Sequence, residues 1–376
     1  MVALVKLGEV CLVKRGTTIT KKQTTKGKIP VIGGGTKPTY FHNQSNRDSN
    51  CITISGSGAS AGFVNRWDIP IFASDCSTVE PKDETQLHKF IYYFLLSRQK
   101  FIYENFRSGA AQPHVYAKDI ETLDYPIIPI AEQKLIITTI DAAFAEIDIA
   151  SISHQKRVDE LVNLQQVYLR KTFRNLSKDW DKVFLGDVCN LVGGGTPSKN
   201  KPEYYNGEIP WATVRDMTCE ELSFTEHKIT ELGLKNSSSK VIPKNNLVIA
   251  SRVGLGKVCI LNQETAINQD LRGVIPKKGT RIDNRFLFYW FKGIADYIIS
   301  EGTGLTVKGV KLPFLNSLSL PMPPIKNQQR IVSELDTIFG QSEISIKLTE
   351  KIIKEHNALK SSILSLLINK IHINGI

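Results

Sequence analysis

The sequence predicts an α+β protein in which one plan, a loop-rich globular segment followed by a long helix, occurs twice. Residues 129–136 (PIAEQKLI) return as residues 324–331 (PIKNQQRI), and an Asp and a Phe follow both copies at the same spacing. Residues 7–11 (LGEVC) likewise return as residues 185–189 (LGDVC). A solenoid repeat is only about 20–50 residues long, so this repeat is the duplication of a whole domain.

We expect four parts in chain order: a globular domain over residues 1–130, a long helix over 131–174, a second globular domain over 181–325 and a second long helix over 326–370. The globular segments are rich in Gly, Pro, Asn, Ser and Thr and contain short β-branched runs, which is typical of short strands joined by many loops. Each also contains an aromatic run near its end, which we assign to a helix in the core.

Both helical segments repeat apolar residues at alternating spacings of three and four, the heptad pattern of a coiled coil. The first has a polar middle at Ser151 and His154, and its stripe continues to Tyr168. A single helix cannot hide such a stripe, so we expect the two helices to pack antiparallel and to give the chain an approximate internal two-fold symmetry. The residues expected to pack in the helix pair are Ile137, Ile140, Phe144, Ile147, Val158, Leu161, Val332, Leu335, Phe339, Ile346 and Ile353. The residues expected to widen the apolar face of the second helix are Leu348, Ile352, Leu359 and Leu366.

The net charge of +11 favours a polyanionic partner such as nucleic acid. Segment 131–174 holds six basic and six acidic residues, and segment 326–370 holds seven and five. The two helices therefore carry 0 and +2, which leaves +9 for the rest of the chain. If the protein grips a phosphate backbone, we expect the globular domains to do so.

The six cysteines form no C-x-x-C pair and, with seven scattered histidines, show no zinc-ligand spacing, so we predict no metal site. We expect the cysteines to be small buried apolar groups in a reducing compartment. No stretch approaches the roughly 20 apolar residues that span a bilayer, and the N-terminus has no signal-peptide pattern. The expected location is cytoplasmic, with no membrane partner.

The chain shows no motif of a catalytic site. It lacks the Asn/Asp-Pro-Pro-aromatic loop of an amino-methyltransferase, and residues 251–257 (SRVGLGK) lack the first Gly and the Ser/Thr of a phosphate-binding loop. Asp75, Glu80 and Lys82 have the spacing of a metal-dependent nuclease, but the second copy has no acid at the position of Glu80. A surface turn is the expected structure there, and we predict no catalytic residue.

Basic and amide side chains accompany the Gly-rich stretches of both globular domains. Lys and backbone N–H groups suit phosphates, Arg suits guanine, and Asn or Gln suits adenine. The candidate DNA-binding residues are Lys37, Asn43, Arg47, Ser57, Arg66, Thr196, Ser198, Lys199, Arg215, Arg252 and Lys257.

The whole chain resembles the specificity (S) subunit of type I restriction–modification systems. Residues 185–188 (LGDV), followed by GGTP and EIPW, resemble the opening of one common class of target recognition domain. Residues 28–34 (KIPVIGG), followed by SGSG, resemble another class, and the repeated PIAEQ/PIKNQ motif resembles the entry to the two helical spacers.

The resemblance implies a non-catalytic, sequence-specific DNA-binding subunit. Each target recognition domain would read one half of an asymmetric, bipartite site in double-stranded DNA, and the helices would set the gap between the halves. The implied partners are two modification (methyltransferase) subunits, which would bind S-adenosylmethionine and methylate adenine, and ATP- and Mg²⁺-dependent restriction subunits. This chain itself would hold no cofactor.

Two other classes of function remain open from the residues alone. The chain could be a structural adaptor with two protein-binding heads, or it could be a nuclease. Steeply salt-dependent binding to duplex DNA would separate DNA recognition from the adaptor, and metal-dependent cleavage by the isolated chain would reveal the nuclease.

Overall fold

The computed structural model describes residues 2–109, 111–304 and 307–373. It divides the chain into two compact units, Met1–Gln155 with Glu350–Ile376 and Lys156–Thr349. Each unit combines a globular part with portions of two long helices. We call the globular parts the first head (residues 2–129) and the second head (residues 180–324).

The first head contains two small sheets and a two-stranded ribbon, with strand orders β2-β8-β5-β6, β4-β3-β7 and β1-β9. Its strands are β1 (Ala3–Lys6), β2 (Cys11–Arg15), β3 (Ile29–Ile32), β4 (Tyr40–His42), β5 (Cys51–Ser55), β6 (Val64–Trp67), β7 (Phe72–Ala73), β8 (Cys76–Pro81) and β9 (Asp124–Ile127). Its helices are α1 (Leu7–Val10), a 3₁₀ turn (Lys21–Gln23), α2 (His88–Ser97), α3 (Gln99–Asn105) and α4 (Ala117–Ile120).

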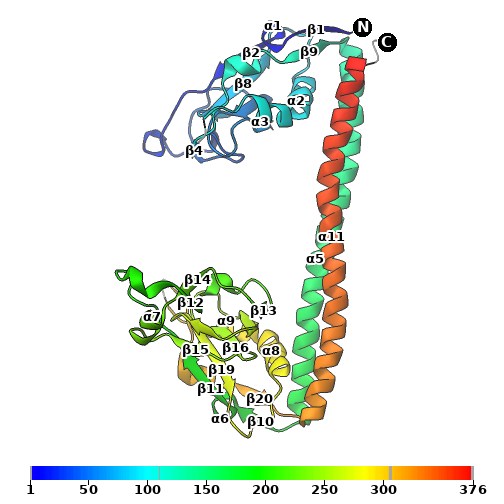
Figure 1. Cartoon of the computed structure of the whole chain (residues 1–376). Coiled ribbons are helices and arrows are strands. Elements are labelled where there is room, and N and C mark those ends of the chain that lie inside the picture. The colour runs from blue at the N-terminus through cyan, green and yellow to red at the C-terminus, as the bar shows by residue number, and fades with distance from the viewer. Residues whose placement is uncertain (1, 110, 305–306, 374–376) are drawn as a thin grey trace. The chain divides into compact units, whose positions relative to one another are not determined.

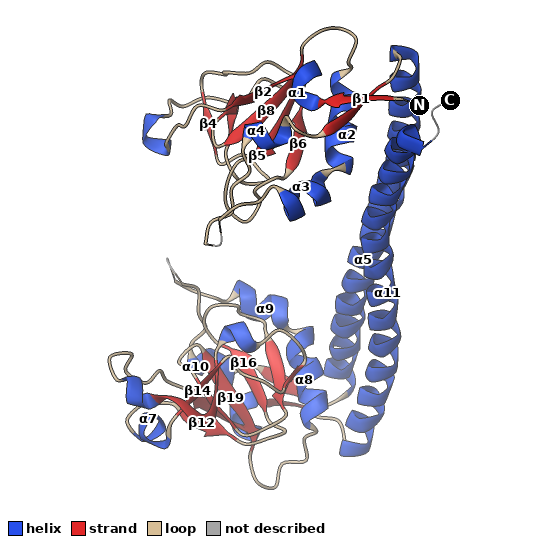
Figure 2. Ribbon diagram, turned by 45° about the horizontal axis from the view of Figure 1, so that its top comes forward, coloured by secondary structure: helices blue, strands red, loops and turns tan. Residues whose placement is uncertain are grey.

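The second head repeats this topology with two added edge strands, in the orders β11-β19-β16-β17-β13, β14-β12-β18-β15 and β10-β20. Its strands are β10 (Lys182–Phe184), β11 (Cys189–Gly193), β12 (Tyr205–Ala212), β13 (Glu221–Leu222), β14 (His227–Ile229), β15 (Lys240–Ile242), β16 (Leu247–Ala250), β17 (Val258–Leu261), β18 (Thr265–Ile267), β19 (Leu271–Pro276) and β20 (Ser319–Pro321). Its helices are α6 (Leu185–Val188), 3₁₀ turns at Pro202–Tyr204 and Val214–Asp216, α7 (Glu231–Lys235), α8 (Asn284–Gly293), α9 (Ala295–Ser300) and α10 (Leu312–Asn316). Figure 2 shows the strands of both heads in red among many loops.

The strand registers confirm the duplication residue by residue. Cys11 pairs with Pro81 in the first head, and Cys189 pairs with Pro276 in the second. Pro81 therefore ends a central strand, and the surface turn expected there was wrong. The missing N–H is tolerated because Pro81 lies beyond Val79, the last residue of β8 that pairs with β5.

The aromatic runs form helices α2 and α8 and are buried, as the sequence predicted. In the first unit Tyr93 of α2 packs edge-on against Phe144, with ring centroids 5.9 Å apart. In the second unit Tyr289 of α8 meets Phe339 at 5.5 Å. Each aromatic helix thus joins its head to the long helices, as Figure 1 shows.

The long helices are α5 (Ile130–Asp179) and α11 (Ile325–Ile373), slightly longer at both ends than the expected ranges. Within the first unit, Asp148 accepts a hydrogen bond from Lys360 at 2.5 Å, and Ser151 meets His356 at 2.7 Å. Partner numbers fall on α11 as they rise on α5, so the pairing is antiparallel, as predicted. None of the helices in the described ranges has the length and apolar character needed to cross a bilayer.

The residues expected in the helix pair face inward to different degrees. The buried ones are Ile140, Ile147, Val158, Leu335 and Phe339. The partly buried ones are Ile137, Phe144, Leu161, Val332, Ile346 and Ile353. Tyr168 is 36% exposed, and Leu169 is fully buried in its place.

The buried apolar stripe of α5 shifts to Leu169 because the second head also packs against this part of the helix. Phe173, one turn further on, contacts Phe286 of α8 with ring centroids 5.4 Å apart. The expected widening of the apolar face on α11 does not give burial: Leu348, Ile352, Leu359 and Leu366 remain exposed.

The repeated glutamine of the PIAEQ and PIKNQ motifs is a buried anchor. Gln133 accepts a hydrogen bond from the N–H of Leu87 at 2.9 Å, and its amide donates to the carbonyl oxygens of Thr85 and Ile128. Gln328 accepts from the N–H of Asp283 at 2.8 Å and donates to the carbonyl oxygens of Arg281 and Pro323. Both side chains are fully buried. Each glutamine therefore ties the first turn of a long helix to the segment before the aromatic helix of its head.

A hydrogen bond from a lysine to a glycine carbonyl oxygen also occurs in both heads. Lys82 donates to the carbonyl oxygen of Gly8 at 2.6 Å, and Lys277 donates to that of Gly186 at 2.6 Å. A Cβ on Gly8 or Gly186 would lie 3.0 or 2.9 Å from a neighbouring side chain, which explains the repeated Leu-Gly pair. Lys82 is thus engaged in holding α1.

The aspartate that follows each anchor motif binds the aromatic helix. Asp141 accepts hydrogen bonds from Tyr93 and Lys89, and Asp336 accepts them from Tyr289 and Arg285. Burial first, and then the bond to the carboxylate, raises the pKa of Tyr93 and Tyr289 above the ordinary value. Both tyrosines therefore stay protonated as donors.

Candidate nucleic-acid interface

The predicted DNA-binding residues of the first head fall into two groups. Lys37 and Asn43 are exposed on loops. Arg47 is engaged internally, since it donates to Thr78 at 2.8 Å and to the carbonyl oxygen of Asn46 at 2.7 Å. Its guanidinium therefore supports the sheet at the central strand β8 rather than pointing to solvent.

Arg66 and Ser57 are also occupied within the first head. Arg66 donates to Asn50 at 2.8 Å and forms an ion pair with Asp68 at 2.6 Å. Ser57 donates a short hydrogen bond to the carboxylate of Asp75. These groups shape the surface, and each has part of its hydrogen-bonding capacity already used.

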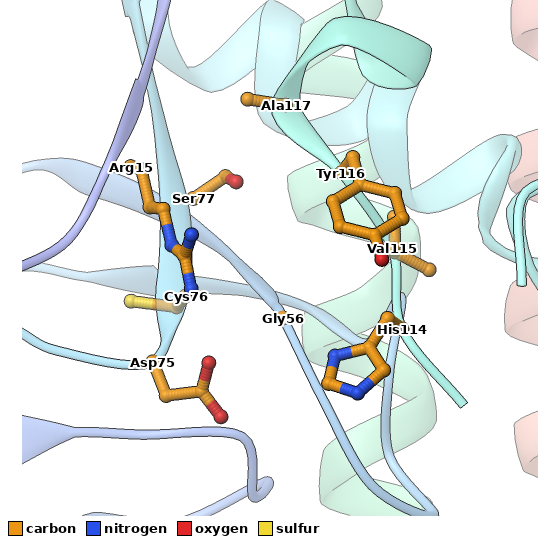
Figure 3. Close-up of a pocket in the computed structure, with 9 residues that line it drawn as sticks. All are labelled: Arg15, Gly56, Asp75, Cys76, Ser77, His114, Val115, Tyr116 and Ala117. Carbon is orange, nitrogen blue, oxygen red and sulfur yellow. The ribbon is translucent and has the colours of Figure 1, made fainter. Parts of the chain in front are cut away.

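Asp75 lines a small cavity of about 40 Å³ in the first head. Figure 3 shows Arg15, Asp75 and Cys76 along one side and His114 and Tyr116 along the other. The His114 and Tyr116 rings are stacked, with centroids 6.2 Å apart. The space is too small for a base.

A much larger cavity, of about 730 Å³, opens in the second head. It contains three of the predicted residues, Thr196, Lys199 and Arg215. The residues that complete its lining are Tyr205, Trp211, Thr213, Val214, His227, Val253, Asn268, Gln269 and Asp270. We call it the second-head cavity.

Close backbone approach explains the Gly-rich stretch beside this cavity. A Cβ on Gly194 would lie 2.2 Å from the carbonyl oxygen of Ile267, so only glycine fits against β18. The N–H of Gly195 then donates to that same oxygen at 3.0 Å, and Trp211 donates to the carbonyl oxygen of Gly195 at 3.1 Å. These contacts fix the position of Thr196 at the rim.

The charged groups around the second-head cavity are mostly basic and exposed. Lys199 and Arg215 are exposed, as is the nearby Ser198. Arg252 is about half exposed and lies 3.7 Å from the carboxylate of Asp270. Lys257 is also exposed, and its ammonium group donates to the carbonyl oxygen of Met217 at 3.3 Å.

Several residues of the second-head cavity were not predicted from the sequence. The aromatic members Tyr205, Trp211 and His227 gave no signal apart from the EIPW motif, which contains Trp211 and resembles part of a target recognition domain. Asn268 and Gln269 stand beside Asp270, the counterpart of Asp75 in the second copy, and that adjacency was the available clue. No group of three or more possible metal ligands occurs within the part of the chain that the structure describes.

Five of the six cysteines are buried core residues. Cys11, Cys51, Cys76, Cys189 and Cys259 are buried, and burial raises the pKa of each thiol to about 12. These five thiols behave as apolar core groups, as the sequence predicted. Cys219 is exposed, so the expectation of burial was wrong for this one residue.

Known proteins share both the sequence pattern and the fold. A specificity subunit of the type I restriction enzyme MjaIX from Methanocaldococcus jannaschii is 32% identical over 188 residues, which cover 48% of this chain and 43% of that protein. A type I specificity subunit of Escherichia coli is 34% identical over 170 residues, 44% of this chain and 42% of that protein. The matched part therefore spans less than half the length of these two relatives. The MjaVIII specificity subunit of M. jannaschii is 23% identical over 345 residues, 85% of this chain and 79% of its own.

Two solved structures have the same fold. One, from work on complex assembly and conformational transition of the type I R-M system, has a TM-score of 0.72 at 18% identity and covers 97% of both chains. The other, an HsdS subunit from Thermoanaerobacter tengcongensis, has a TM-score of 0.51 at 18% identity and covers 97% of this chain and 96% of its own. The family model described as type I restriction modification DNA specificity domain matches residues 2–158 and 177–354. With nearly all of both copies matched, this chain belongs to the family of type I restriction–modification specificity domains.

Proposed function

We propose that the chain is the non-catalytic subunit that selects the DNA sequence in a type I restriction–modification complex. One observation carries this proposal: the two heads share one frame but differ in the side chains at the same junction. After β5 the first head has Ser57 facing Asp75, whereas after β16 the second has Arg252 facing Asp270. Two different surfaces on one frame suit a duplex site with two different halves.

Charge supports a nucleic-acid partner for the heads. Of the net charge of +11, the sequence leaves +9 outside the two helices. Lys37, Lys199 and Arg215 are exposed and suited to phosphate contacts. In a protein that neutralises Z phosphates, log K falls with log[salt] with a slope of about −0.9Z.

The binding test follows from that slope. Equilibrium binding of the chain to duplex DNA is measured between about 50 and 200 mM salt, with the partner methyltransferase present and absent. A protein with six to ten phosphate contacts loses about 10³–10⁵ in affinity over this range. Affinity that does not change with salt would contradict the proposal and favour a protein-binding adaptor.

The exposed apolar residues of the long helices support a protein partner. Within the first unit, Leu135, Ile149 and Ile152 of α5 are 67%, 63% and 70% exposed. They occupy one face of the helix, because residues 14 and 17 positions apart lie within about 100° of each other on an α-helix. Such a stripe fits amphipathic helices of modification subunits. In this proposal those subunits bind S-adenosylmethionine, while separate restriction subunits use ATP and Mg²⁺.

The proposed lack of catalytic activity in this chain has its own test. The purified chain alone is expected to transfer no methyl group to duplex DNA and to cut none. Together with its modification subunit it should direct adenine methylation at a bipartite motif, read by methylome sequencing. Methyl transfer or cleavage by the isolated chain would show that the chain is itself an enzyme.

A further inference from the structure

Gln269 stands on the loop before β19 with its side chain in the second-head cavity. It is exposed, in contrast to the residue at the equivalent place in the first head. Ser55 pairs with Cys76 and Ala250 pairs with Leu271, so the residue two before each partner is Ser74 in one head and Gln269 in the other. Ser74 is buried, and its hydroxyl accepts from the N–H of Ile19.

Both ends of the Gln269 amide are held by neighbouring side chains. Its Oε1 accepts a short hydrogen bond from the hydroxyl of Thr196. Its Nε2 donates to Oδ2 of Asp270 at 3.2 Å. The carbonyl end therefore faces Thr196 and the amino end faces Asp270.

Asp270 is itself fixed, so the clamp is rigid. Its N–H donates to Oδ1 of Asn268 at 3.1 Å, and Nδ2 of Asn268 donates back to Oδ2 of Asp270 at 3.2 Å. Arg252 lies 3.7 Å from its other carboxylate oxygen. These contacts set the rotation of the Gln269 amide before any ligand arrives, which reduces the entropy that binding would cost.

A clamped amide still has capacity for one more ligand at each end. The side chain has two N–H donors and two carbonyl lone pairs, and the clamp uses one of each. The clamp leaves one N–H donor and one carbonyl lone pair on the same planar amide. In the DNA major groove adenine presents the matching pair, the N7 acceptor and the N6 donor, whereas guanine presents two acceptors.

We propose that Gln269 reads an adenine in the half-site bound by the second head, and that Thr196 and Asp270 are the residues that orient it. This inference rests on the proposed DNA recognition and assigns one base to one residue. Lys199 and Arg215, exposed at the same cavity, are placed for phosphates beside that base. The first head has no counterpart, since Ser74 is buried.

The experiment uses the full chain with its modification subunit in cells and reads the methylated motif. Exchange of residues 181–325 for those of a relative first identifies the half read by the second head. Gln269→Met keeps the length of the side chain and removes both hydrogen-bonding groups. It is expected to lower the preference for adenine at one position of that half by about 5- to 140-fold, the range for one bidentate contact. All other positions should stay the same.

A second set of variants tests orientation. Thr196→Val removes the hydroxyl that holds Oε1 and should relax the same position by a smaller factor, whereas Thr196→Ser should restore wild-type preference. The matched control is Gln263→Met, because Gln263 donates to the carbonyl oxygen of Ser223 and does not line the cavity. Thermal melting of each variant checks that it folds. Gln269→Glu serves as a second variant at the same site, because Gln269 is exposed and the substitution should not disturb folding.

The outcomes separate this inference from the proposed function. An unchanged motif in folded Gln269→Met and Gln269→Glu, or a wild-type half-site without an adenine, would overturn the role of Gln269 and leave DNA recognition standing. A wild-type complex that methylates without sequence preference would overturn the proposed function itself. Relaxation at one adenine in the predicted half, absent from Gln263→Met, would support both.

Discussion

Replacing the anchor Gln328 by methionine should destabilise the second unit without touching the proposed DNA surface. The side chain is fully buried and makes hydrogen bonds of 2.8, 3.0 and 2.8 Å to backbone groups of Asp283, Arg281 and Pro323. Methionine has nearly the same length but neither donates nor accepts strongly. One N–H and two carbonyl groups would lose this partner.

The expected cost follows from those three groups. Each buried backbone group left without a partner costs about 1–3 kcal/mol, and the new apolar contacts of methionine offset part of the total. We expect the free energy of unfolding of the second unit to fall by about 3–5 kcal/mol. Gln329→Met is the matched control, since Gln329 is the next residue of the same helix and is exposed. It should change stability by less than about 0.5 kcal/mol.

The assay is urea unfolding followed by tryptophan fluorescence. Trp180, Trp211 and Trp290 lie within the second unit, and only Trp67 lies in the first, so the signal reports mainly the second unit. A loss below about 1 kcal/mol for Gln328→Met, or an equal loss for both variants, would refute the role of the glutamine as an anchor.

Three further predictions concern strain, thiols and helix length. Val253 has φ of +35°, so Val253→Gly should raise the stability of the second unit by about 1 kcal/mol in the same urea assay, whereas Val253→Ala should not. The buried thiols have folded pKa values of about 12 against 9.0 when unfolded, so the free energy of unfolding should be highest below pH 9 and fall between pH 9 and pH 12, by up to about 1.4 kcal/mol per pH unit for each thiol. At about pH 8 only the exposed Cys219 should react rapidly with a thiol reagent. Rapid reaction of several thiols would contradict this prediction. A four-residue insertion after Glu160 adds about 6 Å and keeps the apolar stripe nearly in phase, so it should lengthen the unread gap of the methylated motif by one or two base pairs. A two-residue insertion rotates the stripe by about 200° and should abolish modification. An unchanged gap at full activity with the four-residue insertion would refute a spacing role for the helices.

The sequence predicted the frame of the protein well because the frame depends on local periodicity and on repeats. Heptad spacing identified the inward face of α5 up to Leu161. It failed at Tyr168 because α8 of the second head packs against Leu169 and Phe173. That contact joins residues far apart in the chain. No local pattern reveals it.

The candidate site was harder to predict because it depends on which side chains meet across the sheets. Arg47 has the composition signal of a DNA contact, yet the register places it beside Thr78, where it supports the sheet. Gln269 carried little signal of its own, because its orientation comes from Thr196, which lies 73 positions earlier in the chain. Residue type alone predicts neither outcome.

The division of the chain has a consequence for its synthesis on the ribosome. Ile140 shares the core of the first unit with Leu364 and Ile368, and Asp148 and Lys360 are 212 positions apart. The second unit, by contrast, is continuous in sequence. The portion translated first must therefore wait for the portion translated last before its core is complete, while the middle of the chain can fold in between. A released chain truncated after residue 349 should contain a protease-resistant second unit and a first unit that is still readily cleaved.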